Sequence, residues 1–322
     1  MTRRSATVVA LAFATAVVTS IEPFSGGGWP IVSAQTPERG ASLDPHLFRY
    51  RRSLPEGPAG LVTIPLDAAV LAHSTGPSAG FADVRVMDQS GKQVPYRLEQ
   101  LEESMAVDLP LQRSEPKARE LAPSSNRNIS VYRVNLPYAN LPGGTLVLET
   151  SARVFSRMLT AGVERPPDRN HRDTWFQTHA TGPWVHAPQD RPASAFSLAL
   201  PTLRERELLI AVDEGDNDPL PLERARLLLP AYRLRLYHPG GRLQLLYGRD
   251  DLSVPRYDIA LLGPDMMSAG ARELHPAPAE AATDPAPDSL ISPRVFWLGL
   301  IAAVVVLAGL TVRLIRTRAT PS

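Results

Sequence analysis

The amino-acid sequence predicts an all-β protein made of two β-sandwich units and one C-terminal transmembrane helix. Short segments in which apolar and polar residues alternate recur about every 8 to 15 positions, with Gly, Pro, Asn or Asp between them. No long segment with helical periodicity competes with these strand candidates outside an apolar run near the C-terminus. A polar stretch divides the candidates into two groups, which predicts two units.

A first β-sandwich unit is expected over residues 45–111. The turn residues Asp88–Gly91 lie between its last two strand candidates, so these two strands are expected to form a hairpin. Pro95 lies in the second of them and cannot donate to a β-ladder, which places that strand at a sheet edge or a bulge. The strand candidates of this unit are Leu61–Ile64, Ala82–Val86 and Gln93–Leu98.

The polar residues 112–127 contain two prolines and two consecutive serines, and we expect them to form a linker. A second β-sandwich unit is expected over residues 128–263, because its strand candidates follow one another without intervening helical segments. These candidates are Ile129–Val134, Thr145–Glu149, Ala152–Thr160, Thr174–Thr178, Ala195–Leu200, Glu207–Val212, Arg226–Leu229, Tyr232–Tyr237 and Arg242–Tyr247.

The N-terminus has the pattern of a secretory signal peptide, expected over residues 1–34. Arg3 and Arg4 precede the apolar run Ala6–Val18, which is too short to span a bilayer comfortably. The small residues Val32-Ser33-Ala34 supply a cleavage pattern. The alternatives are an uncleaved signal anchor and a core helix.

The C-terminus is expected to anchor the chain in a membrane through a helix at residues 293–314. Its uncharged run Val295–Val312 would reach about 27 Å as a helix, close to the hydrocarbon thickness of a bilayer. Three arginines follow at once, so the positive-inside rule places the tail, residues 315–322, in the cytoplasm and the body on the far side. The Ala- and Pro-rich residues 264–292 are expected to form an extended stalk. A buried core helix is the alternative to a membrane span.

The composition excludes some sources of stability and some partners. The chain of 322 residues has no cysteine, so an exported body must be stabilised by burial and not by disulfides. Its formal net charge of +1 gives no electrostatic reason to expect nucleic acid as a partner.

Two tryptophans and two histidines invite a functional interpretation. Trp175, His179, Trp184 and His186 lie among Pro, Gly and Asn, and loops of a rigid sandwich often carry recognition residues. An indole ring can stack on a sugar while a nearby polar side chain fixes its orientation. The four residues therefore form a candidate ligand or partner surface. In the alternative, the tryptophans are core or rim residues, and the spacing of the histidines matches no metal signature.

The acidic stretch 213–218 is a candidate cation loop. Asp213, Asp216 and Asp218 supply carboxylates of the kind that calcium takes as ligands, although their spacing is not that of an EF-hand. A solvated turn between two strands is the favoured alternative, since Asp, Asn and Gly dominate turns for backbone reasons. We therefore expect no metal and no cofactor, with structural calcium as the alternative.

No known catalytic pattern occurs in the sequence. It has no Gly-x-Ser-x-Gly elbow, phosphate-binding loop, dinucleotide fingerprint or His-Glu-x-x-His pattern. We therefore expect a protein that is not an enzyme, while a triad assembled from distant residues leaves a hydrolase as an alternative.

Two segments resemble a known family. Phe81–Leu98, in which a strand ending in aspartate turns through glycine into Val-Pro-Tyr, resembles the N-terminal signature of a bacterial family of exported proteins, domain of unknown function 3999. Glu207–Leu220, with Leu245–Gly248 and Val254–Asp258 after it, is similar to the later part of that family. The resemblance covers residues 47–263 and implies an exported protein with a C-terminal membrane helix. It implies no activity and no catalytic residues.

The second unit also resembles a particular kind of sandwich. The order of Val131–Arg133, Ala152–Arg157 and Trp175 is similar to the strand order of galactose-binding-like, discoidin-type jelly rolls. The resemblance implies that residues 128–263 adopt this jelly roll.

These observations together predict a non-enzymatic bacterial envelope protein. Its body would lie in the periplasm, held by one helix to the inner membrane, and would recognise a glycan or another envelope protein. The first alternative is a structural subunit that pairs with a multispan membrane protein, for which Gly299 and Ala303 would allow close helix contact. The second alternative is a hydrolase of envelope polysaccharide.

Overall fold

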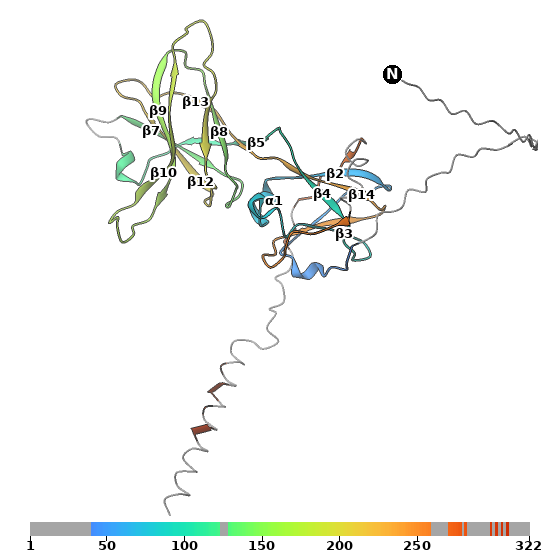
Figure 1. Ribbon diagram of the computed structural model, residues 1–322. Coiled ribbons are helices and arrows are strands. Elements are labelled where there is room, and N and C mark those ends of the chain that lie inside the picture. Colours follow the sequence, from blue (N-terminus) through green and yellow to red (C-terminus); the bar gives the residue numbers. More distant parts are fainter. Residues whose placement is uncertain are drawn as a thin grey trace, which may run out of the picture. The chain divides into compact units, whose positions relative to one another are not determined.

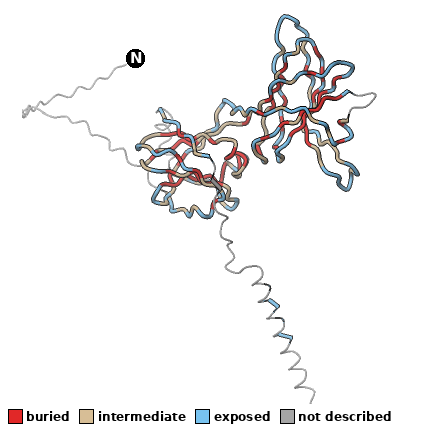
Figure 2. Tube along the Cα trace, turned by 180° about the vertical axis from the view of Figure 1, so that it is seen from behind, coloured by how far each residue is buried: buried red, intermediate tan, exposed pale blue. Residues whose placement is uncertain are grey.

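The computed structural model describes two groups of β-sheets in sandwich-like packing, which confirms the predicted all-β class. Figure 1 shows the strands in two sets, and Figure 2 shows buried stretches, in red, in both of them. The structure describes residues 40–122, 128–258, 270–278 and 280–281, and the single positions Trp297, Leu300, Ile301, Val304, Leu307 and Ala308.

The first sandwich consists of two four-stranded sheets, with strand orders β17-β1-β15-β3 and β16-β2-β14-β4. A short helix, α1 (Ala68–His73), follows β2, and the Asp67 carboxylate caps it by accepting a hydrogen bond from the Val70 amide at 3.2 Å. No helical periodicity in the sequence predicts this short helix. The strands are β1 (Tyr50–Ser53), β2 (Gly60–Leu66), β3 (Arg85–Asp88), β4 (Tyr96–Gln100), β14 (Tyr232–His238), β15 (Leu243–Tyr247), β16 (Arg272–Glu273) and β17 (Glu280–Ala281).

The second sandwich consists of a five-stranded sheet, β10-β9-β12-β7-β6, and a four-stranded sheet, β11-β8-β13-β5. Inward-facing leucines and valines of both sheets belong to one hydrophobic cluster. The strands are β5 (Met105–Leu109), β6 (Leu111–Arg113), β7 (Ile129–Asn135), β8 (Gly144–Thr150), β9 (Phe155–Arg165), β10 (Trp175–His186), β11 (Phe196–Leu200), β12 (Glu207–Asp213) and β13 (Leu222–Leu229).

Strand pairing divides the chain differently from the expected boundaries. β14 and β15 lie inside the expected second unit, 128–263, yet each pairs on both sides with strands of the first sandwich. The second sandwich is thus inserted between β4 and β14. Its two connections run side by side, because the Leu101 amide donates to the Ala231 carbonyl at 2.9 Å. Sequence order alone could not reveal this return of the chain.

The expected hairpin of the first unit is replaced by a crossing between sheets. β3 and β4 flank the predicted turn, but β3 pairs with β15 and β4 with β14. The turn itself forms, with an isolated bridge between Met87 and Gln93. β4 begins directly after Pro95 and is an edge strand, as the missing proline N–H predicts.

Much of the expected linker, residues 112–127, is folded onto the second sandwich. Its start belongs to β6, which pairs with β7. A 3-10 helix, η3 (Arg119–Leu121), follows, and Leu121 and Ala118 are buried against apolar residues on the outer face of the five-stranded sheet. The Glu164 carboxylate accepts a hydrogen bond from the Ala118 amide at 2.7 Å. Two apolar side chains in a polar stretch are thus enough to dock it.

The described part of the expected stalk, residues 264–292, packs against the first sandwich. β16 pairs in parallel with β2, and β17 pairs with β1. Leu274 is buried, and the Arg52 guanidinium donates to the Pro276 carbonyl at 3.1 Å. Backbone pairing and one buried leucine hold a segment whose composition alone predicts an extended chain.

The expected signal peptide, 1–34, and tail, 315–322, lie outside the described residues. Within the expected membrane helix, 293–314, the six described positions are helical and exposed. Among the residues described, none belongs to a helix that is long and apolar enough to cross a membrane.

Candidate functional site

The candidate surface residues on β10 do not form one surface. β10 is the edge strand of the five-stranded sheet and pairs along its whole length with β9, from Trp175 opposite Arg165 to His186 opposite Phe155. Eleven positions of extended strand separate these ends by roughly 36 Å. The strand predicted from the sequence ends at Thr178, because the Gly and Pro that follow it favour a loop. An edge strand tolerates both residues.

Trp184 is a core residue, so the candidate surface does not include its indole face. Its side chain is 5% exposed, and the indole ring packs edge-on against Phe155 at 5.2 Å and stacks on Phe196 at 5.4 Å. The indole N–H donates to the Ser194 carbonyl at 3.2 Å. At the same end of the strand, His186 Nε2 lies 3.1 Å from the Arg191 carbonyl.

Trp175 and His179 lie at the other end of β10. The Trp175 ring stacks on His171 at 4.2 Å, and Asp168 Oδ1 lies 3.0 Å from Nδ1 of that histidine. His179 occupies a β-bulge, and burial lowers its pKa; the nearby Arg165 lowers it further, against the opposing effect of Glu205. Indole Nε1 and His179 Nε2 are buried without hydrogen-bond partners among the described residues. This end carries polar groups, and the neighbouring Phe176 and Thr178 line a cavity of about 360 Å3.

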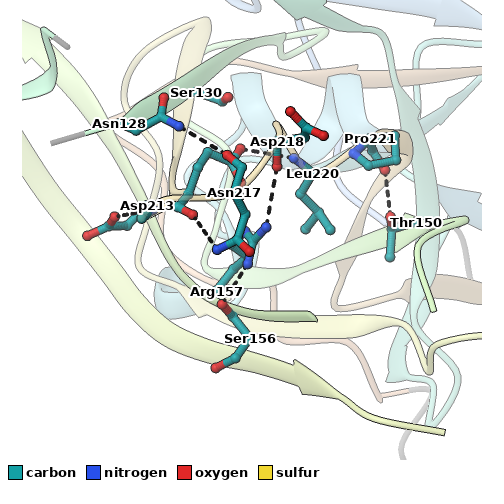
Figure 3. A network of polar contacts seen from close by, with 12 residues as sticks. Asn128, Ser130, Thr150, Ser156, Arg157, Asp213, Asn217, Asp218, Leu220 and Pro221 are labelled. Carbon is teal, nitrogen blue, oxygen red and sulfur yellow. Dashed lines mark hydrogen bonds and ion pairs between the residues drawn. The ribbon is translucent and has the colours of Figure 1, made fainter. Parts of the chain in front are cut away.

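The acidic stretch 213–218 is a turn organised by a buried ion pair. Glu214 is buried, and its carboxylate Oε2 lies 2.7 Å from Nε of Arg157, the arginine labelled in Figure 3. Its Oε1 accepts a hydrogen bond from the Leu220 amide at 3.1 Å, and Arg157 Nη2 donates to the Asp218 carbonyl at 3.3 Å. The acid that organises the turn is therefore Glu214, which was not among the predicted ligands, because its burial depends on an arginine 57 positions earlier in the chain.

The three candidate cation ligands of this turn point to solvent. Asp213, Asp216 and Asp218 are all exposed, and Asp213 Oδ1 accepts a hydrogen bond from the Gly215 amide at 3.1 Å. Nowhere in the described part of the chain do three or more metal-ligating side chains gather. The solvated turn, which was the favoured alternative, matches this arrangement.

A concave site that no sequence pattern predicts lies in the first sandwich. An open cleft of about 800 Å3 is bounded by the segment Ser253–Tyr257, which we call the strap. The other walls come from Gly40, Ala41, Gln93 and Arg85. The strap is fixed at both ends, because Arg85 Nη2 donates to the Ser253 carbonyl at 2.9 Å and the Tyr257 hydroxyl donates to Gln93 Oε1 at 2.9 Å.

Tyr257, which lines this cleft, packs against a second tyrosine, Tyr96. The rings of Tyr96 and Tyr257 meet edge to face at 5.4 Å, and the Tyr96 hydroxyl donates to the Val84 carbonyl at 2.6 Å. Burial raises the pKa of Tyr257 to about 12, against the opposing charge of Arg85, and burial also raises the pKa of Tyr96. Both phenols are therefore neutral near pH 7 and keep their hydrogen-bond donors.

The cleft combines a guanidinium, a side-chain amide and aromatic surface, which suits noncovalent binding of a polar ligand. Its residues come from parts of the sequence more than 150 positions apart, so no local pattern marks them. Comparisons of the chain with family models, with curated proteins and with solved structures return no match.

Proposed function

We propose that this chain is a non-enzymatic binding protein of the bacterial envelope, and that the strap cleft is where its body takes a ligand. The observation that carries the proposal is the cleft of about 800 Å3, whose walls include the buried Arg85 and the half-buried Tyr257. Small-molecule sites have this range of volume and this mixture of apolar lining with a few fixed polar groups.

The envelope setting rests on the two ends of the sequence. A positive N-terminus before a short apolar run supports export, and an uncharged run before three arginines supports one membrane helix with its C-terminus in the cytoplasm. The resemblance to domain of unknown function 3999 supports the same arrangement. We also propose that the second sandwich is a galactose-binding-like jelly roll, on the order of its strand segments.

Binding of envelope glycans to the full chain, purified in detergent, tests the proposal. We expect a subset of glycans on an array to bind, and we expect Arg256→Gln, at the mouth of the cleft, to weaken that binding. The proposal would be contradicted if no glycan on the array bound the chain and if envelope extracts also left its melting temperature unchanged. Protease added from the periplasmic side tests the topology: it should digest the body and leave a fragment with Arg313–Ser322.

A structural subunit of a membrane complex is the second candidate function. Exposed apolar side chains gather on the β9–β10 hairpin, where Met158 is 45% exposed and Val185 is 63% exposed. Ser156 pairs with Val185 and Met158 with Pro183, so these side chains share one face of the sheet. Purification of the full chain from detergent tests this function. It would be favoured if a membrane protein copurified with the wild-type chain in a stoichiometric amount and did not copurify with the Met158→Asp variant.

A further inference from the structure

We infer that the strap cleft binds an oxyanion, a carboxylate or a phosphate carried by a small ligand, with Arg85 and Arg256 as its counter-charges. The inference rests on the proposed function, because it assigns a ligand chemistry to the same cleft. It follows from the unusual surroundings of Arg85.

Arg85 is a buried cation whose described partners are neutral. It is 6% exposed, and Nη1 donates to the carbonyls of Ala82 and Val84, both at 2.7 Å, while Nη2 donates to Ser253. These three bonds leave two of the five guanidinium N–H groups without a carbonyl partner. Carbonyl dipoles solvate a charge in part, but they do not neutralise it.

The other buried arginines of the described chain show what Arg85 lacks. Arg52 lies 2.7 Å from Asp67, Arg157 lies 2.7 Å from Glu214, and Arg235 lies 3.0 Å from Glu99. Arg85 has no carboxylate within ion-pair distance in the described region. A buried cation without a counter-ion is costly, and an anion bound in the adjacent cleft would remove that cost.

The buried acid closest to Arg85 in the sequence is already engaged. Asp83 lies two residues before Arg85 and is fully buried. Its Oδ1 accepts hydrogen bonds from the Thr75 amide and hydroxyl at 2.9 and 2.8 Å, and its Oδ2 accepts from the Gly248 amide at 2.6 Å. Asp83 thus holds two loops together and leaves the counter-charge of Arg85 to a ligand.

The remaining groups of the cleft favour a polar anion over an apolar one. Arg256 is exposed and lines the same cleft, so a ligand would meet two guanidinium groups. The planar fork of arginine matches both carboxylate and phosphate oxygens. Gln93 and Tyr257, already bonded to each other, can orient the hydroxyl groups of a ligand such as an acidic sugar.

Isothermal titration of the full chain in detergent tests this inference with three probes: glucuronate, glucose 6-phosphate and neutral glucose. We expect at least one anionic probe to bind at least about tenfold more tightly than glucose, with affinity falling as salt rises. The two anionic probes distinguish a carboxylate source from a phosphate source. Equal binding of all three, or no binding of either anion, overturns the inference.

Two variants tie binding to the cleft. Arg256→Gln should weaken anion binding at least about tenfold and leave the melting temperature unchanged, since this side chain is exposed. Arg191→Gln removes another exposed arginine, one that belongs to the second sandwich, and should change neither anion binding nor the melting temperature. Arg85→Lys keeps the charge and removes the fork; if it does not fold, Arg256→Gln decides alone. Unchanged affinity in Arg256→Gln overturns the inference, whereas cleft-dependent binding of neutral glycans on the array would leave the proposed function standing.

Discussion

The two tryptophans of β10 differ in what surrounds their indole N–H groups. That of Trp184 donates to the Ser194 carbonyl, whereas that of Trp175 is buried without a described partner next to the half-buried His171 ring. Both residues look alike in the sequence, because each follows a polar stretch in an aromatic-poor chain. Their surroundings differ because they lie near opposite ends of β10, which only the pairing with β9 reveals.

Replacing Trp184 by alanine should lower the free energy of unfolding by about 3 to 5 kcal/mol, because the substitution opens a cavity between Phe155 and Phe196. Denaturant unfolding of the full chain measures it. Val185→Ala is the matched control on the neighbouring, exposed position and should cost less than about 0.5 kcal/mol. Similar losses for both variants would contradict a core role for Trp184.

His238 gives the fold an expected dependence on pH. The residue is fully buried, its Nδ1 accepts a hydrogen bond from the Gly240 amide at 2.9 Å, and burial, aided by the charge of Arg272, lowers its pKa. Burial is also the leading cause of lowered pKa values at His73 and His179. All three histidines therefore favour the neutral form in the folded state.

The contribution of these neutral histidines to the free energy of unfolding should be fully present above about pH 6.5, the pKa of a histidine in the unfolded chain. It should be lost as the pH falls below that value, because protons then bind the unfolded chain more readily than the folded one. Unfolding free energies measured from pH 8 to pH 5 check the direction. His238→Asn, which retains an acceptor for Gly240, should flatten this dependence. A wild-type protein that becomes more stable on acidification would contradict the assignment.

At the scale of the element, the β12–β13 turn shows how a buried ion pair can organise an exposed acidic segment. Glu214 binds the arginine of β9 and the Leu220 amide, and Asn217 donates through its side chain to the Glu214 carbonyl at 3.0 Å. The turn is thereby fixed to the strand beside it. The exposed aspartates around it are left to the solvent.

Glu214→Gln should destabilise the second sandwich by about 3 to 5 kcal/mol, because it leaves the charge of Arg157 buried without its partner. The double variant Glu214→Leu with Arg157→Met should lose less, since it removes both charges together. Unfolding curves of the two variants, with Asp216→Asn as an exposed control from the same turn, make the comparison. Equal losses in the single and double variants would show that packing, not charge, dominates.

The strands were predictable from the sequence to the extent that their side chains alternate. Ile129–Val134 and Glu207–Val212 fall within β7 and β12, whose apolar residues are buried on the inner face by the core and on the outer face by Ala118 and Leu121. The pairing of β14 with β2 was not predictable, since 165 or more positions separate the partners and the intervening chain forms a sandwich of its own. The strap cleft was not predictable for the same reason, since its walls come from segments that are far apart in the sequence.

At the scale of the whole molecule, the chain after β15 returns to complete the first sandwich. β16 extends the sheet at β2, and β17 extends the other sheet at β1. Between them, Leu274 fills the core and the Arg52 guanidinium is shared by the Pro276 carbonyl and Asp67. A segment expected to lift the body away from a membrane thus stabilises the body itself.

Leu274→Ala should therefore destabilise the first sandwich by about 2 to 5 kcal/mol, the usual cost of truncating a buried leucine. Thermal unfolding of the full chain measures it, and Leu47→Ala, at a partly exposed leucine of the same sandwich, is the control that should have little effect. If residues 270–278 were an extended stalk in solution, both variants would have the same melting temperature as the wild-type protein.

The insertion of one sandwich into the other also fixes an order of events during synthesis. β14 and β15 are interior strands of their sheets, each flanked on both sides, yet they leave the ribosome after every strand of the inserted sandwich. Until they arrive, β1 to β4 have apolar faces and unpaired edges with nothing to cover them, a condition that invites aggregation. The inserted sandwich can fold as soon as β13 is made. The first sandwich, whose first strands are synthesised before all others, would therefore need chaperones that bind nascent chains for the longest time.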